Sequence, residues 1–379
     1  MSEEGEGAMV HFPGFFRSPI LVFPAMHLTL LVPELLWPEP DDHPALAATA
    51  CPALENLLSR GQFTRSAAQT AEATLYALFG HDPATLPGAL RRRGENDAPD
   101  VGDERWLCAD PVHLRLHDER LILADSTQFD VSLDEAQQLV DALNAELPEI
   151  GDFHAASAER WYLRLRKDSA LPPFEAPPLS GVSGHHVGQL LPDILDDRGW
   201  RRHFNAIQTV LHAHPLNQQR AAEGRMTLNS LWLWGDGPMP AERRSPFDAV
   251  WSNQALAHGL ARAAGMTPHP QPNGFAAVLA GIGASTHPLV VIDDLLAPAC
   301  YDDGNHWITV LAVLEAAWFV PLRQALASGT LHQLHLVAST THGLLRWTCR
   351  RSDRWKFWRR PLALATVTTQ LARSAKEKA

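Results

Sequence analysis

Short apolar runs alternate along this chain with longer stretches in which apolar residues recur every three or four positions. The short runs, at 26–33, 289–292 and 334–337, are followed by turn-forming, acidic or small polar residues. Runs of this length are typical of strands buried on both faces of a parallel sheet. The longer stretches predict amphipathic helices. We expect these helices at 53–59, 66–79, 133–147, 200–211, 253–264 and 302–327, and a further strand at 228–233.

Residues 105–170 have a different pattern. Two segments, 112–117 and 121–124, predict a hairpin, and 161–165 predicts another strand. Between them, Ser132 and Glu135 have the spacing of a capping box at the start of a helix. Strand, strand, helix and strand in this order indicate a small α+β unit inserted into the main fold.

The alternation of strands and helices on both sides of this unit predicts the fold class. We expect an α/β protein with three layers, in which a mostly parallel sheet carries helices on both faces. The polar segment 91–104 and the proline-rich segment 171–183 mark the limits of the inserted unit. The expected division is a tail at 1–25, a first part of the core at 26–95, an inserted α+β domain at 105–170 and a second part of the core at 190–379.

Composition narrows the range of partners. The chain has 379 residues and a formal net charge of -11, which argues against general binding to nucleic acid or to an anionic membrane, since both rest on Lys and Arg. The four cysteines form no Cys-x-x-Cys pair, which fits a reducing compartment. The acidic N-terminal segment lacks the pattern of a secretory signal, and no run of about 18 apolar residues occurs. We therefore expect a cytoplasmic protein.

Residues 214–237 are the strongest candidate for a binding site. Pro215 ends one predicted helix and Asn217 can cap the next, which places Arg220 on the same face as Asn217. The glycines on either side of Asp236 follow a predicted strand, where backbone amides can approach an anion. A capped helix with a solvated arginine and a plain turn explain the same residues, so both interpretations stay open.

Two other groups of residues have less defined chemistry. Asp293, Asp294, Asp302 and Asp303 follow the predicted strand at 289–292 and could hold a hard cation, although helix capping explains the second pair. The run 350–360 interleaves cations and aromatic rings, which can stack bases but more often form an amphipathic edge strand. We do not expect a nucleic-acid partner, and a structural or protein-binding role for this run stays open.

Several separated segments together resemble the archaeal-type cofactor-independent phosphoglycerate mutases of the alkaline phosphatase superfamily. They occur in the family's order. They are 51–57 with Gly61, 80–83, the inserted unit with 132–144, 214–220 with Gly224 and Asn229, and 232–237. The resemblance implies an alkaline phosphatase-like sheet with an inserted domain. It also implies a substrate pocket formed by Asn217, Arg220, Asn229, Trp234 and Asp236.

The departures from this family concern its catalytic side. Counting back from residues 80–83, the position of the nucleophilic serine falls on Ala71, and without a hydroxyl no phosphoserine can form. Pro33-Glu34 stands where the family has Asp-Gly, and its later Asp-His pair falls near Ser339 and Thr340. Two divalent ions need about six or seven ligands, of which one or two are matched here. The candidate ligands of a remaining metal ion are Glu34, Asp293, Asp294 and Asp302.

Within the superfamily, the chain is similar to a proteobacterial branch labelled RpfE-type regulatory proteins. The similar segments are 106–116, 159–165, 229–237 and 293–301. We hypothesise a regulatory pseudoenzyme that binds a small anionic metabolite and requires no cofactor. The alternative is a divergent phosphoglycerate mutase or phosphatase that uses Mn²⁺ or Mg²⁺ at the candidate carboxylates.

Overall fold

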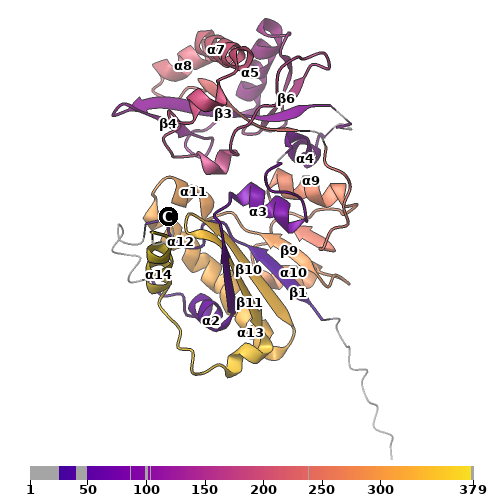
Figure 1. The fold of residues 1–379 in the computed structure, drawn as a ribbon, viewed down its shortest axis with the longest axis vertical. Coiled ribbons are helices and arrows are strands. Elements are labelled where there is room, and N and C mark those ends of the chain that lie inside the picture. Colours follow the sequence, from indigo (N-terminus) through magenta and orange to yellow (C-terminus); the bar gives the residue numbers. More distant parts are fainter. Residues whose placement is uncertain are drawn as a thin grey trace, which may run out of the picture.

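The computed structural model describes residues 25–39, 49–85, 87–98, 101–102, 104–237 and 239–376 of the chain. These residues form two β-sheets, each packed against helices, that lie one above the other in Figure 1. The predicted tail at 1–25 lies outside the described residues apart from Ala25.

The larger sheet contains six strands in the order β2-β11-β10-β1-β9-β8. The central strand β1 (His27–Leu31) pairs in parallel with β10 (Gln333–Thr340) and with β9 (Pro288–Val291). β8 (Ala249–Trp251) extends the parallel part, whereas β11 (Gly343–Arg350) runs antiparallel to β10 and to β2 (Gln62–Ser66). The mostly parallel sheet and the strands predicted from the three apolar runs are confirmed.

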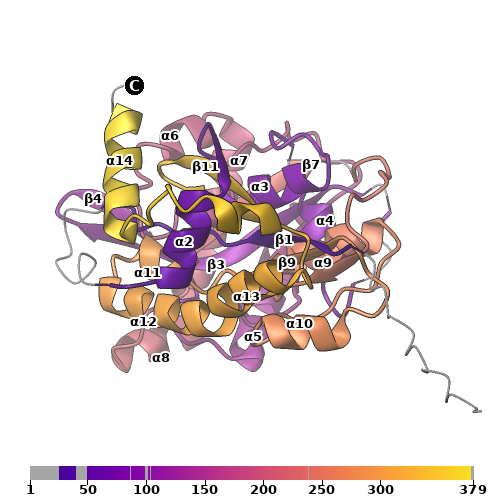
Figure 2. The same ribbon diagram turned by 90° about the horizontal axis from the view of Figure 1, so that it is seen from below.

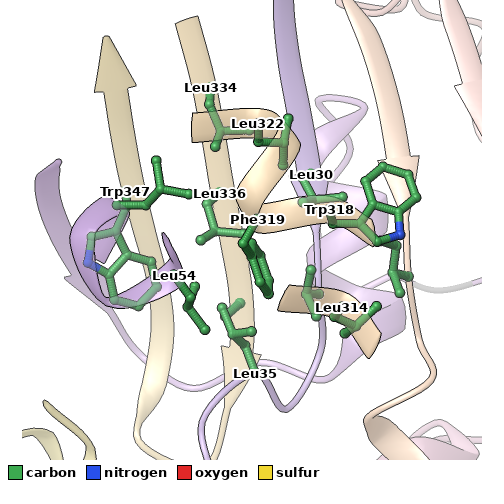
Figure 3. Close-up of a cluster of buried hydrophobic side chains, with 14 of the residues drawn as sticks. Leu30, Leu35, Leu54, Leu314, Trp318, Phe319, Leu322, Leu334, Leu336 and Trp347 are labelled. Atoms are coloured by element: carbon green, nitrogen blue, oxygen red, sulfur yellow. The ribbon is translucent and has the colours of Figure 1, made fainter. Parts of the chain in front are cut away.

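Helices cover both faces of this sheet. Successive residues of a strand face opposite sides, so a continuous apolar run gives both faces apolar side chains to bury. Leu28 and Leu30 pack on one face, and Leu31 packs on the other. The first face carries α2 (Pro52–Arg60), α10 (Phe275–Gly281), α12 (Gly304–Leu314), α13 (Val320–Ser328) and α14 (Leu364–Lys376), and Figure 3 shows part of this cluster. The second face carries α3 (Ala71–Leu78), α4 (Gly88–Arg93) and α9 (Ala255–Ala263). The predicted three-layer α/β fold is therefore confirmed.

One long helix in the first layer is apolar enough, by length and composition alone, to cross a membrane. It spans Gly304–Ser328, where α12 and α13 are joined by the π-helical turn η2 (Glu315–Phe319). Its side chains Trp318 and Phe319 pack into the core of the sheet (Figure 3). The carboxylate of Glu315 accepts hydrogen bonds from the amides of Ala53 at 2.6 Å and Leu54 at 3.1 Å. This side chain therefore caps α2, whose first residues lack a side-chain cap of their own.

The smaller sheet is antiparallel and is built around the long strand β3 (Trp106–His117), which pairs on one edge with β4 (Arg120–Ala124) and β6 (Trp161–Leu165). β5 (Gly151–Ala155) extends that edge, and β7 (Ser230–Gly237) pairs with the other edge of β3. The predicted hairpin and the capping box of Ser132 and Glu135 at the start of α5 (Leu133–Glu146) are confirmed, whereas β5 was not predicted.

The smaller sheet takes in more of the chain than the expected insertion at 105–170. α7 (Arg198–Ala213) packs against α5 through Trp200 and Ile207, α8 (Pro215–Ala222) follows it, and β7 pairs with β3. The chain returns to the larger sheet only at β8, which differs from the expected start of the second core part at 190. A helical pattern shows that one face is buried but not which sheet buries it. Part of the expected boundary loop at 91–104 likewise belongs to α4.

Candidate functional site

Two adjoining cavities lie between the carboxyl ends of the parallel strands and the smaller sheet. The first, which we call the edge cavity, has a volume of about 880 Å³ and is lined from β10, α3, α11 (Leu296–Cys300) and the turn after β1. The second, the inner cavity, has a volume of about 280 Å³ and is lined by residues of the smaller sheet, of the loops after β8 and β9, and of α3, α4 and α9. Ser180, Leu296 and Cys300 line both, so the two cavities adjoin.

Glu34 lies in the turn after the central strand and lines the edge cavity. Its amide donates to the carbonyl of Ser339 at 2.9 Å, and its carbonyl accepts from the indole of Trp307 at 2.9 Å. Its φ of 51° lies in the left-handed region that favours glycine. Glycine is the residue that the family resembled by this chain has in this turn. The Oε2 atom is shielded from solvent without a hydrogen-bond partner, and burial raises the pKa of Glu34 to about 8.

Ala71, at the position that the resemblance gives to a nucleophile, begins α3 and lines the edge cavity. The hydroxyl of the preceding Thr70 accepts from the amide of Ala73 at 3.2 Å and so caps the helix. The next residue, Glu72, lines the inner cavity, where the hydroxyl of Ser180 donates to its carboxylate. Burial raises the pKa of Glu72. At this position the structure therefore presents a methyl group next to a shielded carboxyl group.

The four candidate metal ligands do not converge. Glu34 and Asp302 line the edge cavity, but Asp302 is exposed, in a turn with a φ of 54°. Asp293 lines the inner cavity and accepts from the amide of Gln254 at 3.0 Å, while Asp294 is exposed. In the part of the chain that the structure describes, no group of three or more His, Cys, Asp or Glu side chains is placed to hold a metal ion. This donor set does not fit the two divalent ions that the resemblance implies.

Arg91 is the first of two fixed cations in the inner cavity. It lies on α4, and its Nη1 atom contacts both carboxylate oxygens of Asp110 on β3, at 2.8 and 2.9 Å. The indole of Trp234 donates to the same carboxylate at 2.8 Å. The guanidinium lies 5.4 Å from the ring centroids of Trp234 and Tyr162, which places it between two aromatic side chains. Because Asp110 is fully buried, this pair holds Arg91 in one position at the cavity wall.

Arg160 is the second cation. Its Nε and Nη2 atoms donate to the two oxygens of Glu95 at 2.7 and 2.9 Å, and the hydroxyl of Tyr162 donates to Glu95 at 2.7 Å. Burial opposes ionisation of Glu95, but these hydrogen bonds outweigh it and the pKa of Glu95 is lowered. The side chain of Arg160 is 34% exposed and lines the inner cavity, so one part of its guanidinium is fixed and another is accessible.

Arg220, a predicted ligand-binding residue, is engaged entirely inside the protein. Its side chain is 0% exposed, and its donors bind the carbonyl of Met226 at 2.8 Å, the carboxylate of Glu135 at 2.9 Å and the carbonyl of Asp130 at 2.7 Å. These bonds join α8 to the start of α5. The structure therefore leaves no part of this guanidinium accessible to a ligand.

The predicted residues Asn217 and Asn229 also bind the backbone. The amide of Asn217 donates to the carbonyls of Leu211 and Leu228, both at 2.8 Å, and accepts from the amide of Leu228 at 2.9 Å. The amide of Asn229 pairs in the same way with the N–H and C=O of Leu114. Each asparagine therefore supplies backbone pairing where a helix or strand ends.

Of the five predicted residues, Trp234 lines the inner cavity, through the contact with Asp110 described above. Asp236 is almost fully buried and bonds to Arg105 and to the amide of Phe174, the latter at 2.9 Å. It therefore attaches the proline-rich segment to β7. The five residues do not form one pocket.

The two arginines that line the inner cavity are not among the residues predicted from the sequence. Arg91 stands in the segment interpreted as a boundary loop, and Arg160 precedes a predicted strand. A usable signal was Asp110, a carboxylate in the otherwise apolar first half of β3, because a buried charge requires a partner.

Comparison with known proteins places phosphoglycerate mutases among the relatives of this chain. No family model matches. Over 205 residues the chain is 28% identical to the 2,3-bisphosphoglycerate-independent phosphoglycerate mutase of Methanosarcina mazei, which covers 52% of this chain and 50% of the relative. The identity to the enzyme of that name from Pyrococcus horikoshii is 29% over 210 residues, covering 50% and 48%. The chain spans about half the length of the curated relatives it matches.

One solved structure resembles nearly the whole fold. The PH0037 protein from Pyrococcus horikoshii matches with a TM-score of 0.56 and 13% identity, covering 94% of this chain and 97% of that one. A cofactor-independent phosphoglycerate mutase from Thermoplasma acidophilum matches with a TM-score of 0.43 and 14% identity, covering 86% and 90%. At the identity of the first match the likeness concerns the fold alone. The chain is thus similar in sequence to phosphoglycerate mutases over half its length, and its mixed α/β fold resembles that of the PH0037 protein.

Proposed function

We propose that this chain is a phosphoglycerate mutase-like protein that binds a small anionic metabolite in the inner cavity and transfers no phosphoryl group. The observation that supports the absence of phosphoryl transfer is the methyl group of Ala71 in the edge cavity. The phosphoglycerate mutases that the chain resembles have their nucleophile at this position. A methyl group accepts no phosphoryl group, so the two-step transfer through a phosphoserine has no first acceptor.

The anion is proposed to bind between Arg91 and Arg160. Both guanidiniums line the inner cavity. A carboxylate of the protein holds each in place, Asp110 for Arg91 and Glu95 for Arg160. Cations that are already held in place lose little conformational entropy on binding, and their N–H donors fit carboxylate and phosphate oxygens. Asn253 lines the same cavity. We propose a phosphoglycerate or a related phosphorylated acid as the ligand class.

Carboxyl groups in the same cavity set the pH dependence of this binding. Burial raises the pKa of Glu72 and of Asp293, which favours their uncharged forms. An uncharged carboxyl group donates a hydrogen bond to an anion, whereas an ionised one repels it. We therefore expect calorimetry to show affinity rising as the pH falls and these groups take up protons. An affinity that fell with the pH would contradict the proposed location.

Calorimetry with 3-phosphoglycerate, with and without Mn²⁺, tests the binding, and an enolase-coupled assay tests turnover. We expect binding without turnover. Arg160→Gln should weaken binding roughly tenfold, because a charge-assisted hydrogen bond is lost. Arg164→Gln is the matched control, since Arg164 lies on β6, the strand directly after Arg160 in the chain, and pairs with Asp152 and Glu104 but does not line the cavity.

The enzyme alternative predicts different results from the same two assays. Turnover in the presence of Mn²⁺ that disappears in Glu34→Ala or Asp293→Ala would contradict the non-catalytic half of the proposal. Absence of binding by 3-phosphoglycerate and related phosphorylated acids would contradict the ligand half. Equal affinity in Arg160→Gln and Arg164→Gln would place the ligand elsewhere.

A further inference from the structure

A third cavity lies at the end of the larger sheet opposite to the carboxyl ends of its parallel strands. It has a volume of about 260 Å³ and is lined where α2 ends, where β11 ends and along α13 and η3 (Arg351–Trp355). Figure 1 shows these elements at the end of the molecule farthest from the smaller sheet. Five arginines line it: Arg60, Arg323, Arg350, Arg351 and Arg354. We call it the arginine cavity.

The arginine cavity concentrates positive charge in a chain whose formal net charge is -11. Its lining contains one carboxylate, Asp353, which already pairs with Lys356 at 2.7 Å. Guanidiniums held this close repel one another, and the repulsion is relieved by an opposite charge between them. The whole-chain charge, which argues against anionic partners, does not describe this end of the molecule.

Helix capping accounts for some of these cations. Arg354 donates to the carbonyl of Ala327 at 3.2 Å at the end of α13, and Arg60 donates to the carbonyl of Arg354 at 3.2 Å. Outside the cavity lining, Lys356 and Arg359 donate to the last carbonyls around α2. Positive side chains at helix C-termini are stabilising, so these contacts have a structural explanation.

Other donors have no such explanation. Among the described residues, the side chains of Arg323 and Arg351 make no hydrogen bond or ion pair, although both residues line the cavity. The Nε atom of Arg60 is shielded from solvent and lacks an acceptor. An unpaired shielded donor costs free energy unless a ligand or water satisfies it. Three guanidiniums from α2, α13 and η3 therefore have unused donors at one cavity.

We propose that the arginine cavity binds a ligand with two or more phosphate groups, separately from the ligand of the inner cavity. Arginine forks match phosphate oxygens in pairs, and several together fit more charge than a single phosphate carries. The volume has room for roughly nine waters at about 30 Å³ each, which suffices for a pyrophosphate group. The indole of Trp355, 4.8 Å from the guanidinium of Arg354, supports the cavity wall.

The phosphates can come from a free metabolite or from a lipid headgroup. Trp355, Phe357 and Trp358 are 63%, 75% and 68% exposed beside the cavity, and exposed aromatic rings next to cations suit an interface as well as solvent. The recognised chemistry is the same in both cases. The experiment therefore needs a soluble arm and a vesicle arm.

The test uses the full chain, with calorimetry for pyrophosphate and ATP and co-sedimentation with phosphatidylcholine vesicles that contain a phosphatidylinositol bisphosphate. Arg323→Glu combined with Arg351→Glu should reduce binding by roughly tenfold or more, because two unused guanidiniums are replaced by like charges. The charge-matched control is Arg166→Glu with Lys167→Glu, two exposed residues that follow β6 of the smaller sheet. Arg160→Gln should leave this binding unchanged, which separates it from the inner cavity.

Each result decides the proposal. Binding in either arm that is lost in Arg323→Glu/Arg351→Glu and kept in the control supports it, and the arm that binds identifies the source of the phosphates. Absence of binding in both arms overturns it. An equal loss in the control also overturns it, because the effect is then one of overall charge. Capture of single-stranded RNA that depends on Trp358, without binding of pyrophosphate, overturns it in favour of base stacking.

Discussion

The carboxyl group of Glu34 gives the protein a pH dependence that originates at a single residue. Its pKa is about 8 in the folded chain and 4.5 in the reference state, so the folded chain binds the proton more tightly. The stability contributed by protonation is complete below pH 4.5 and is lost as the pH rises to about 8. Each pKa unit corresponds to about 1.4 kcal/mol. Glu34→Gln should therefore flatten the dependence of the urea midpoint on pH between 5 and 8.

Glu146→Gln, at the exposed end of α5, is the control for this measurement. The same measurement in millimolar Mn²⁺ tests the metal alternative, since a bound cation favours the ionised carboxylate and would remove the slope. We expect Mn²⁺ to leave the wild-type slope in place. Parallel slopes for wild type and Glu34→Gln would show that another group titrates.

Ala71→Ser tests whether a hydroxyl at the position that the resemblance gives to a nucleophile is enough for phosphoryl transfer. We expect no phosphoserine by mass spectrometry after incubation with 3-phosphoglycerate and Mn²⁺. A serine needs a base or a metal to become a nucleophile, and the donors around the edge cavity do not fit the metal pair. A phosphorylated Ala71→Ser chain would show that the rest of the machinery is intact.

At the scale of the elements, Arg220 connects α8 with the start of α5, so we expect it to matter for stability and not for binding. Arg220→Ala leaves the carbonyls of Met226 and Asp130 without their buried donor, while Glu135 keeps Arg225. The substitution should lower the free energy of unfolding by at least about 1–3 kcal/mol. Arg225→Ala is a close control, because Arg225 pairs with Asp130 and Glu135 but is one third exposed. Its cost should be about 0–1 kcal/mol. Urea unfolding measures both variants.

Calorimetry with 3-phosphoglycerate completes this comparison. Arg220→Ala that remains folded should keep wild-type affinity. A stable Arg220→Ala chain that no longer binds the ligand would restore Arg220 as a ligand-binding residue.

Elements defined by local chemistry could be predicted from the sequence, and their placement could not. The capping box of Ser132 and Glu135 and the hairpin between β3 and β4 depend on neighbouring residues. The choice of sheet for α7 and β7 depends on contacts with α5 and β3, which lie about 60 or more positions away and leave no periodic signal.

The same limit explains the candidate site. The sequence predicts that Asn217 and Arg220 share a face that could hold an anion, but their partners are Leu228 and Glu135, inside the protein. A ligand-binding arginine and a structural one have the same sequence signal, because both follow a cap or a turn. What distinguishes Arg160 is one third of its side chain left exposed at a cavity, which only the fold determines.

For the whole molecule, α4 connects the two layers that carry the sheets, because it contacts both α9 and β3. This short helix carries Arg91 and lies between α9 and β3. A Cβ atom on Gly88 would lie 2.8 Å from the amide nitrogen of Cys108 on β3, and one on Gly94 would lie 1.7 Å from the carbonyl oxygen of Ala255 on α9. Glycines on both sides therefore allow the backbones to touch, and the width of the inner cavity depends on these contacts.

Gly259→Ala tests this dependence from the α9 side. Alanine is favoured over glycine within a helix by about 1 kcal/mol, yet its methyl group would lie 1.7 Å from the carbonyl oxygen of Leu90. α4 must therefore move away, which should lower the free energy of unfolding by about 1–3 kcal/mol. The displacement of Arg91 should also weaken binding of 3-phosphoglycerate. Gly281→Ala, with no atom within 4 Å, is the control and should change stability by at most about 1 kcal/mol. Equal stability and affinity in the two variants would show that α4 does not set the cavity.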